Sequence, residues 1–202
     1  MTRASAPGHG RGAKPGEVRL IAGQWKRSKL AVLDRPGLRP TPDRVRETLF
    51  NWLGHDLTGW HCVDAFAGTG ALGFEAASRG AASVLMVESD QTLVLQLRQV
   101  QRQLGASAVQ VVSGDALRVL SALAPGSLDL VFMDPPFATA LLEPALRATI
   151  AALAAGGLVY LEAPLAWNDA RLGAFGLVCQ RHLRAGAVHA HLLARIGAEL
   201  AV

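Results

Sequence analysis

The sequence predicts an α/β fold in which a mostly parallel β-sheet is covered by helices on both faces. From about residue 60, short apolar runs typical of buried strands alternate with amphipathic stretches typical of helices. The rhythm breaks near the end of the chain, where two β-like runs within 176–196 flank RAGA without a helix between them. This break predicts an antiparallel hairpin at the end of the sheet.

The elements can be placed in order along the chain. Two β-like runs around a Gly-containing turn within 17–33 predict a hairpin. A helix should follow, with Thr41 as its N-cap, Pro42 at its first position and Asp43 in its first turn. The strands that we expect next cover residues 61–68, 83–90, 109–116, 128–137 and 158–164, and the helices between them cover 70–81, 91–106, 117–124 and 142–157.

Composition divides the chain into three regions. Residues 1–16 are rich in Gly, Pro, Arg and Lys and predict a disordered basic tail. Residues 17–58 form the hairpin and helix extension, and residues 59–202 form the main α/β domain. No apolar run is long enough to span a bilayer, and the N-terminus lacks the apolar core of a secretory signal, so we expect a cytoplasmic protein.

The cysteines and histidines do not predict a metal site. Cys62 and Cys179 lie far apart in apolar segments, and we expect both to be buried free thiols. His182, His189 and His191 form no recognisable metal-binding pattern with these cysteines, so we interpret them as ordinary strand residues.

Charge is concentrated in the first quarter of the chain. Residues 1–50 hold eleven Lys/Arg and four Asp/Glu, whereas residues 51–202 hold nine and twelve. Arginine outnumbers lysine seventeen to three, and its planar fork suits phosphates and guanine edges. A nucleic-acid partner and a merely solvated basic tail both explain this distribution. The candidate phosphate contacts are Arg19, Lys26, Arg27 and Lys29.

A glycine-rich loop follows the first strand of the alternating region. Gly68, Gly70 and Gly73 have G-x-G-x-x-G spacing between a strand and a helix, where glycines allow a ligand to approach the backbone closely. Glu88 stands twenty residues after Gly68, at the end of the next strand, where a carboxylate can accept hydrogen bonds from both ribose hydroxyls. A plain glycine-rich turn is the alternative, but the combination favours a nucleotide-type cofactor.

Two further acids bear on which cofactor this is. Asp64 ends the first strand just before the glycines, where its charge would repel a pyrophosphate and suit a cationic ligand. S-adenosylmethionine carries an ammonium and a sulfonium, so Asp64 favours it over NAD. Asp115 ends the third strand, where it could accept a hydrogen bond from the adenine amino group or act as the N-cap of the next helix.

The sequence LVFMDPPFAT, residues 130–139, places a carboxylate and two prolines at the end of a buried strand. The carboxyl ends of parallel strands are where α/β sheets bind ligands. The prolines restrict the backbone, so the Asp134 carboxylate and the Pro135 carbonyl become fixed acceptors, with Pro136 and the flat ring of Phe137 beside them. An Asp-Pro-Pro turn after an edge strand is the alternative.

Such a set of acceptors suits an exocyclic amine on a nucleobase. Two acceptors can bind the two amine hydrogens and direct the nitrogen lone pair towards a methyl donor, while Phe137 stacks on an extruded base. Adenine N6, cytosine N4 and guanine N2 all fit this loop. Whether Asp134 must also act as the base stays open.

These motifs resemble known families. DPPF is similar to the (D/N)PP(Y/F) signature of amino-group methyltransferases. VDAFAGTGALGFEAASRGA, RPTPDRVRETLFNWL and RLIAGQWKRSKL resemble the bacterial RsmD family over roughly residues 18–184. The likeness implies a seven-stranded, Rossmann-like class I S-adenosylmethionine-dependent methyltransferase sheet with a terminal antiparallel hairpin. It also implies methyl transfer to N2 of one guanine in 16S rRNA, on the assembled or nearly assembled small ribosomal subunit.

The resemblance also implies which residues act. Arg39, Thr41 and Arg44 match a family block that lies over the cofactor and the RNA, and Arg44 is a further candidate RNA contact. LRAGAVHAHLLARI departs from the family because it lacks an aromatic residue expected in the last strand. The expected catalytic loop is Asp134, Pro135, Pro136 and Phe137, and the expected cofactor residues are Asp64, Phe66, Gly68, Thr69, Gly70, Glu88, Ser89, Asp115, Ala116, Arg39 and Thr41.

Two other functions compete with methyl transfer. NAD-dependent oxidoreduction fits the glycines and Glu88 but leaves the DPPF loop and the basic extension unexplained. A ribosome-binding protein with a vestigial cofactor pocket would bind RNA without incorporating methyl groups. For the methyltransferase we expect 16S rRNA in the small subunit as partner, no metal, no membrane and a monomeric chain.

Overall fold

The computed structural model describes residues 16–33, 41–136 and 140–197 and confirms the α/β fold. A seven-stranded sheet has the order β5-β4-β3-β6-β7-β9-β8, and only its last two strands run antiparallel to their neighbours. The strands are β3 (His61–Asp64), β4 (Ser83–Glu88), β5 (Val109–Ser113), β6 (Leu128–Met133), β7 (Leu153–Ala163), β8 (Leu177–Ala185) and β9 (Val188–Arg195). The helices are α1 (Asp43–Leu53), α2 (Ala71–Ser78), α3 (Gln91–Leu104), α4 (Ala116–Ser121), α5 (Leu142–Ala152) and α6 (Asp169–Gly173).

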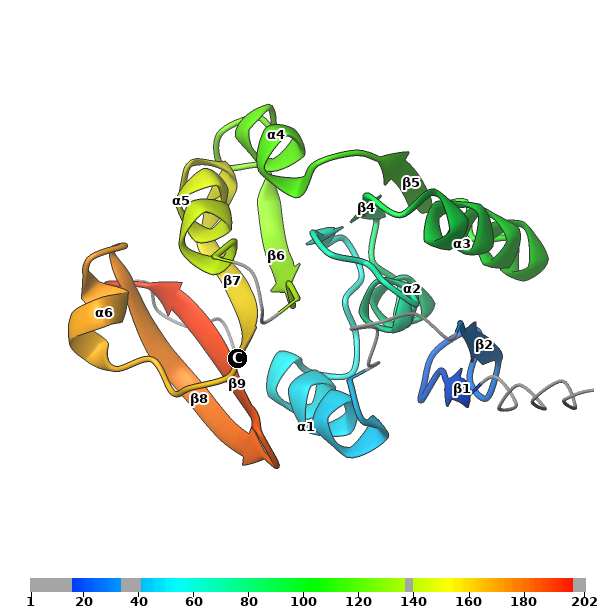
Figure 1. Ribbon diagram of the computed structural model, residues 1–202, viewed down its shortest axis with the longest axis horizontal. Helices are drawn as coiled ribbons and strands as arrows, with labels where there is room; N and C mark the ends of the chain where they lie inside the picture. Colours follow the sequence, from blue (N-terminus) through cyan, green and yellow to red (C-terminus); the bar gives the residue numbers. More distant parts are fainter. Residues whose placement is uncertain (1–15, 34–40, 137–139, 198–202) are drawn as a thin grey trace, which may run out of the picture.

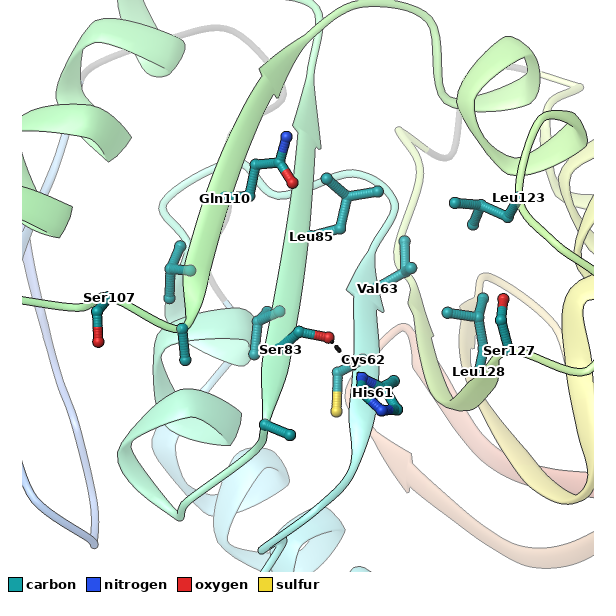
Figure 2. Close-up of a pocket in the computed structure, with 14 residues that line it drawn as sticks. His61, Cys62, Val63, Ser83, Leu85, Ser107, Gln110, Leu123, Ser127 and Leu128 are labelled. Carbon is teal, nitrogen blue, oxygen red and sulfur yellow. Dashed lines mark hydrogen bonds between the residues drawn. The ribbon is translucent and has the colours of Figure 1, made fainter.

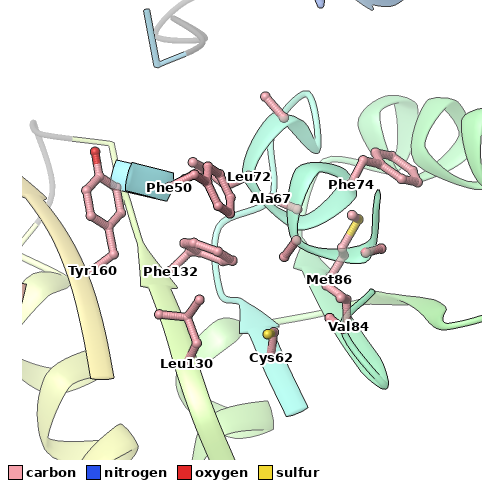
Figure 3. Packing of buried hydrophobic residues seen from close by; sticks show 14 of the residues in the cluster. Phe50, Cys62, Ala67, Leu72, Phe74, Val84, Met86, Leu130, Phe132 and Tyr160 are labelled. Atoms are coloured by element: carbon pink, nitrogen blue, oxygen red, sulfur yellow. The ribbon is translucent and has the colours of Figure 1, made fainter. Parts of the chain in front are cut away.

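Helices cover both faces of the sheet (Figure 1). On one face, Phe50 of α1 and Phe74 of α2 belong to the same buried cluster as Phe132 and Tyr160. On the other face, α4, α5 and α6 pack over the alternate residues of the same strands. The aromatic rings of the first cluster lie in contact, with ring centroids of Phe132 6.0 Å from Phe50 and 6.3 Å from Tyr160 (Figure 3).

The strand order places the change of direction at β3. The chain proceeds outward from β3 through β4 to β5 and then returns to β6 on the other side of β3. Open α/β sheets bind ligands outside the carboxyl ends of the strands at such a switch point. The glycine loop follows β3 and the Asp-Pro-Pro sequence follows β6, so both predicted motifs lie at this edge.

The N-terminal extension contains the expected hairpin, formed by β1 (Gly16–Arg19) and β2 (Lys29–Val32) in antiparallel register. The turn between them is anchored on α2 by backbone hydrogen bonds. Ile21 and Ala22 donate their amides to the Glu75 carboxylate at 2.7 and 3.0 Å. Gly23 is required for this contact, because a Cβ at that position would lie 1.8 Å from the Ser78 carbonyl oxygen.

Three local predictions are wrong. Thr41 does not cap α1 with its side chain, because its hydroxyl donates to the buried Glu162 instead, at 2.8 Å. The helix predicted over 142–157 ends at Ala152, and β7 begins directly at Leu153, where the chain pairs with Leu128 of β6. Helix α6 was not expected.

The two cysteines differ in burial. Both are free thiols, and Cys62 is buried as predicted. Cys179 is only half-buried, because it lies on β8, the edge strand of the sheet. Burial raises the pKa of the Cys62 thiol to about 12, so this residue is a structural core thiol and not a nucleophile.

Candidate active site at the carboxyl edge of the sheet

The glycine loop and Glu88 lie in direct contact. The Gly68 amide donates to Glu88 Oε2 at 2.9 Å, and the Ser89 and Asp90 amides donate to Glu88 Oε1 at 2.8 and 2.9 Å. Gly70 has a φ of 78°, and a Cβ there would lie 2.6 Å from Leu97. The spacing of these residues in the sequence therefore predicts their proximity correctly.

Asp64 and Gly73 connect the first strand with the helix that follows the loop. The buried Asp64 carboxylate accepts the Gly73 amide at 3.0 Å, which is one of the free donors at the start of α2. A Cβ on Gly73 would lie 2.5 Å from the Met86 side chain, so this glycine serves the packing of helix on sheet. The helix N-terminus that would bind a pyrophosphate thus already faces a carboxylate.

The ends of β4 and β5 bring Asp115 to the same edge. The Gly114 amide donates to the Glu88 carbonyl at 3.0 Å, which places the Asp115 segment beside Glu88. Asp115 caps α4, because its carboxylate accepts the Arg118 amide at 2.9 Å. The capping interpretation is therefore confirmed, and the exposed side chain keeps a second oxygen for a ligand. Ala116, the first residue of α4, is buried.

Three of the remaining candidate cofactor residues differ in their exposure to solvent. Thr69 is buried in the loop, Phe66 is half-buried against the second core cluster, and Ser89 is exposed. Arg39 lies outside the described residues, and so does Phe137 of the catalytic loop.

Asp134 follows the last residue of β6 and lies on the sheet face that α1 covers. Asp134 is half-buried, and its carboxylate has no hydrogen-bond donor and no ion-pair partner in the part of the chain that the structure describes. Pro135 is buried and Pro136 is exposed. Burial, together with the charges of Glu162 and Asp64, raises the pKa of Asp134 well above its usual range. An acid whose pKa is strongly raised by burial and by neighbouring acids, at the edge that carries the glycine loop, is typical of a binding or catalytic site.

Glu162 is a site residue that the sequence did not single out. It is 3% exposed near the end of β7, and its Oε1 accepts the hydroxyls of Tyr160 at 2.7 Å and Thr41 at 2.8 Å. Burial raises its pKa as well. An acid within the otherwise apolar strand end LVYLEA, next to the strand that carries Asp134, was the available signal.

Asp64, Asp134 and Glu162 form an acidic centre at this edge. Burial raises the pKa of Asp64 to about 7, and Glu88 contributes further through its charge. None of the ion pairs among the described residues involves any of the three. A centre of this kind attracts a cation and disfavours a phosphate.

The candidate RNA contacts lie on the surface of the extension, where four belong to the hairpin or its turn and Arg44 belongs to α1. Lys29 forms an ion pair with Glu17 at 2.7 Å across the hairpin. Arg27 adopts a left-handed conformation with φ 71°, which a non-glycine residue seldom takes. Four other candidates are exposed and form no ion pair among the described residues: Arg19, Lys26, Arg27 and Arg44.

A pocket of about 480 Å³ lies at the opposite end of the strands (Figure 2). His61, Ser83 and Gln110 line it together with apolar residues at the amino ends of the strands. His61 Nδ1 lies 2.8 Å from the Ser83 hydroxyl. Because the glycine loop and Asp134 are at the carboxyl ends, this pocket is not the predicted site.

The described ranges contain neither a cluster of metal ligands nor a helix that could cross a membrane. No three His, Cys, Asp or Glu side chains of 16–33, 41–136 and 140–197 are arranged to hold a metal ion. Over the same ranges, each helix is too short or too polar to cross a membrane.

Comparison with solved structures defines the class of protein. The structure is similar to that of yhhF from Escherichia coli, with a TM-score of 0.77 and 38% identity over 89% of this chain and 98% of that one. The precorrin-6y C5,15-methyltransferase of Geobacter metallireducens has the same fold, with a TM-score of 0.65 at 18% identity over 82% of this chain and 94% of its own. The fold is therefore that of the class I methyltransferases.

Sequence comparison identifies the family. Residues 18–193 match the family model described as Conserved hypothetical protein 95. The Ribosomal RNA small subunit methyltransferase D of Escherichia coli K12 is 48% identical over 128 residues, which cover 63% of this chain and 64% of that protein. The chain thus spans just under two thirds of the length of this relative. It belongs to the Conserved hypothetical protein 95 family, which is the RsmD family of the sequence prediction.

Proposed function

We propose that this chain is an S-adenosylmethionine-dependent methyltransferase that modifies N2 of a guanine in the 16S rRNA of the small ribosomal subunit. One observation carries the proposal: three carboxylates, the buried Asp64 and Glu162 and the half-buried Asp134, meet a glycine loop and an Asp-Pro-Pro sequence at one edge of the sheet, and none of them is in an ion pair among the described residues. The name of the Escherichia coli relative supports an rRNA substrate.

The residues present fit S-adenosylmethionine. Glu88 is fixed by three backbone amides, and a ribose would lie against its carboxylate and the adjoining Gly68. A ligand that carries an ammonium and a sulfonium would favour the ionised forms of Asp64 and Asp134, whose pKa values burial raises in the free protein. Thr69, Gly70, Ser89, Asp115 and Ala116 would complete the cofactor site from the same edge. When bound, S-adenosylmethionine supplies an electrophilic methyl group on a sulfonium sulfur.

The Asp-Pro-Pro sequence would hold the other reactant. Asp134 and the Pro135 carbonyl accept the two hydrogens of the guanine amine and orient its nitrogen towards the methyl group. As the new C–N bond forms and the bond between the methyl carbon and the sulfonium sulfur breaks, the sulfur would keep the electron pair as a neutral thioether. The nitrogen would acquire the positive charge, and its surplus proton would pass to the Asp134 carboxylate. The raised pKa of Asp134 favours that proton transfer, because a carboxylate with a higher pKa is a stronger base.

The basic surface of the extension would bind the RNA backbone. Lys26, Arg27 and Arg44 offer exposed charges for phosphates. The extension is fixed on the catalytic domain at two points, because the turn at residues 21–25 binds α2 and Thr41 binds Glu162. Phosphate contacts on the hairpin would therefore position the RNA relative to Asp134. We propose that the protein works in the cytoplasm, as a monomer and without a metal.

Replacing Asp134 with Ala tests this function. We expect S-adenosylmethionine binding within about threefold of wild type and a loss of methyl transfer of at least about 1000-fold, because both orientation and proton acceptance depend on this carboxylate. The measurements are calorimetric titration of the cofactor and mass mapping of methylated nucleotides in unmethylated small subunits incubated with labelled cofactor. Wild-type turnover in the variant would contradict the proposal.

The same measurements separate the competing functions. Tighter binding of NAD than of S-adenosylmethionine would favour an oxidoreductase, although the occupied N-terminus of α2 disfavours a pyrophosphate there. Subunit binding without methyl incorporation would favour a ribosome-binding protein. Methyl groups on adenine N6 or cytosine N4 would show that the loop serves a different base.

A further inference from the structure

The position of Glu162 bears on which nucleobase the site accepts. The inference rests on the proposed methyltransferase function. β6 and β7 are parallel and pair Phe132 with Tyr160 and Met133 with Leu161. The next position in this register places Asp134 beside Glu162. Since side chains alternate along a strand, both carboxylates lie on the face of Phe132 and Tyr160, which α1 covers.

The two oxygens of Glu162 are in different situations. Oε1 accepts two hydroxyls, from Tyr160 and from Thr41, at 2.7 and 2.8 Å. Oε2 has no hydrogen-bond donor among the described residues, and it is not one of the enclosed side-chain atoms that lack a partner there, so it is accessible from the site. Thr41 is itself fixed, because its carbonyl accepts the Nε–H of the fully buried Arg46 at 3.2 Å. Two donors on one oxygen fix the orientation of the carboxylate, so Oε2 is a positioned acceptor for which the described residues supply no donor.

When a ligand displaces water from an acceptor of this kind, the ligand must supply the donor, because an acceptor left without one destabilises the complex. The donor must enter from the same side as the amine that Asp134 holds, because the two carboxylates are neighbours on one face of the sheet. Any base held there would bring its Watson–Crick edge, with the ring nitrogen beside the amine facing the Glu162 position.

The three possible bases differ at that ring nitrogen. In guanine the position next to the amine is N1–H, which is a donor. In adenine and cytosine the corresponding ring nitrogen has a lone pair and no hydrogen, so it is an acceptor. Asp134 and the Pro135 carbonyl suit the amine of all three bases, whereas an acceptor at Glu162 suits guanine alone.

We propose that Glu162 is the residue that selects guanine, by accepting the N1–H of the target base on Oε2. The site then offers three acceptors to the three donors on the guanine edge: the Asp134 carboxylate, the Pro135 carbonyl and Glu162. With adenine or cytosine, Oε2 would face a lone pair, and a site built to bind a donor rejects an analogue that lacks it.

The experiment replaces the mapped target guanine of 16S rRNA with 2-aminopurine and reconstitutes small subunits. This base keeps the amine in place and has a lone pair at N1. For wild type we expect kcat/KM to fall by at least about 100-fold relative to guanine. For Glu162→Gln we expect the difference to shrink to about tenfold or less, because the amide carbonyl still accepts the two hydroxyls and the amide nitrogen now donates to N1. The missing O6 of 2-aminopurine affects both enzymes and cancels in the comparison.

Tyr160→Phe is the matched control. It removes one donor to Oε1 but leaves Oε2 as an acceptor, so the guanine preference should stay within about threefold of wild type while overall activity falls. Equal preference in wild type and Glu162→Gln, with guanine methylated by both, would overturn the inference and leave the proposed function intact. Should Glu162→Gln fail to fold, equal kcat/KM of wild type on guanine and on 2-aminopurine would still overturn the inference. Absence of guanine methylation by wild type would instead overturn the proposed function.

Discussion

The protein buries carboxylates in two regions and satisfies them in opposite ways. Glu75 on α2 is fully buried and accepts the amides of Ile21 and Ala22 and the guanidinium of Arg79, whose distances are 2.7 to 3.0 Å. Asp134 and Glu162, at the carboxyl edge of the sheet, are in no ion pair among the described residues. The hydrogen-bond donors around Glu75 occupy both of its carboxylate oxygens. At the carboxyl edge, the described residues leave carboxylate oxygens of Asp134 and Glu162 available to a ligand.

This difference distinguishes carboxylates that stabilise the fold from carboxylates that are available for binding or catalysis. A buried carboxylate with a full set of donors holds two parts of the chain together, in this case the N-terminal extension and α2. A buried carboxylate without such a set reduces stability, and it persists where binding or catalysis requires it. The substitution of each type of acid should therefore change stability in opposite directions.

The largest expected effect on stability is that of Glu75→Gln. Gln has one acceptor oxygen, so its amide nitrogen would face donors, and Arg79 would stay buried without a counter-charge. We expect the free energy of unfolding to fall by about 3–5 kcal/mol, measured by urea denaturation. Glu162→Gln is the comparison, and it should change stability by less than about 1 kcal/mol. Similar losses in both variants would contradict the distinction between the two regions.

Asp64→Asn should have the opposite sign. Because burial raises the pKa of Asp64 in the folded state to about 7, its protonated form is favoured by folding, and its contribution to stability declines as pH rises from about 4 to about 7. Above that range the ionised group destabilises the fold. The amide keeps an acceptor for the Gly73 amide without the charge. We expect the variant to be more stable than wild type by about 1–2 kcal/mol at pH 8.

The pH dependence is the test of that cause. The gain from Asp64→Asn should decrease towards pH 5, because the wild-type carboxyl is then mostly protonated and already neutral. Urea unfolding of both proteins at pH 5 and pH 8 measures this. An equal difference at both values would mean that packing and not ionisation sets the effect.

The sequence was informative where a motif is local and less so where contacts join distant segments. The glycine loop and Glu88 meet as their spacing implied, because both follow adjacent parallel strands. Glu162 was missed because its partner Thr41 lies 121 residues earlier in the chain, and the same contact explains why Thr41 does not cap α1. Hydrogen bonding in the folded protein outweighed the local capping preference.

The start of β7 shows the same limit for the fold. Residues 153–157 continue the small-residue pattern of α5, so the helix was predicted to run through them. In the structure they form the start of β7, and Gly157 passes so close to β6 that a Cβ would lie 2.7 Å from the Leu128 carbonyl oxygen. Strand pairing with a distant segment decided the structure there, and local propensity could not reveal it.

The smallest expected effect concerns the exposed charges of the hairpin, in contrast to the buried ones. Replacing Lys26 with Gln and Arg27 with Gly should weaken subunit binding and reduce the slope of log affinity against log salt by about 1.5, because each phosphate contact contributes about 0.7–0.9. Lys29→Gln should change the slope less, since Lys29 already pairs with Glu17. Arg118→Gln replaces an exposed arginine on α4; it is the control and should leave the salt slope unchanged.

A stability measurement shows whether the double variant still folds. Glycine accommodates the φ of 71° at position 27, so we expect the unfolding midpoint of the double variant to be at or above that of wild type. Weaker subunit binding at such a midpoint would then come from lost contacts and not from lost folding. An unchanged salt slope in the double variant would mean that the basic hairpin is only a solvated surface.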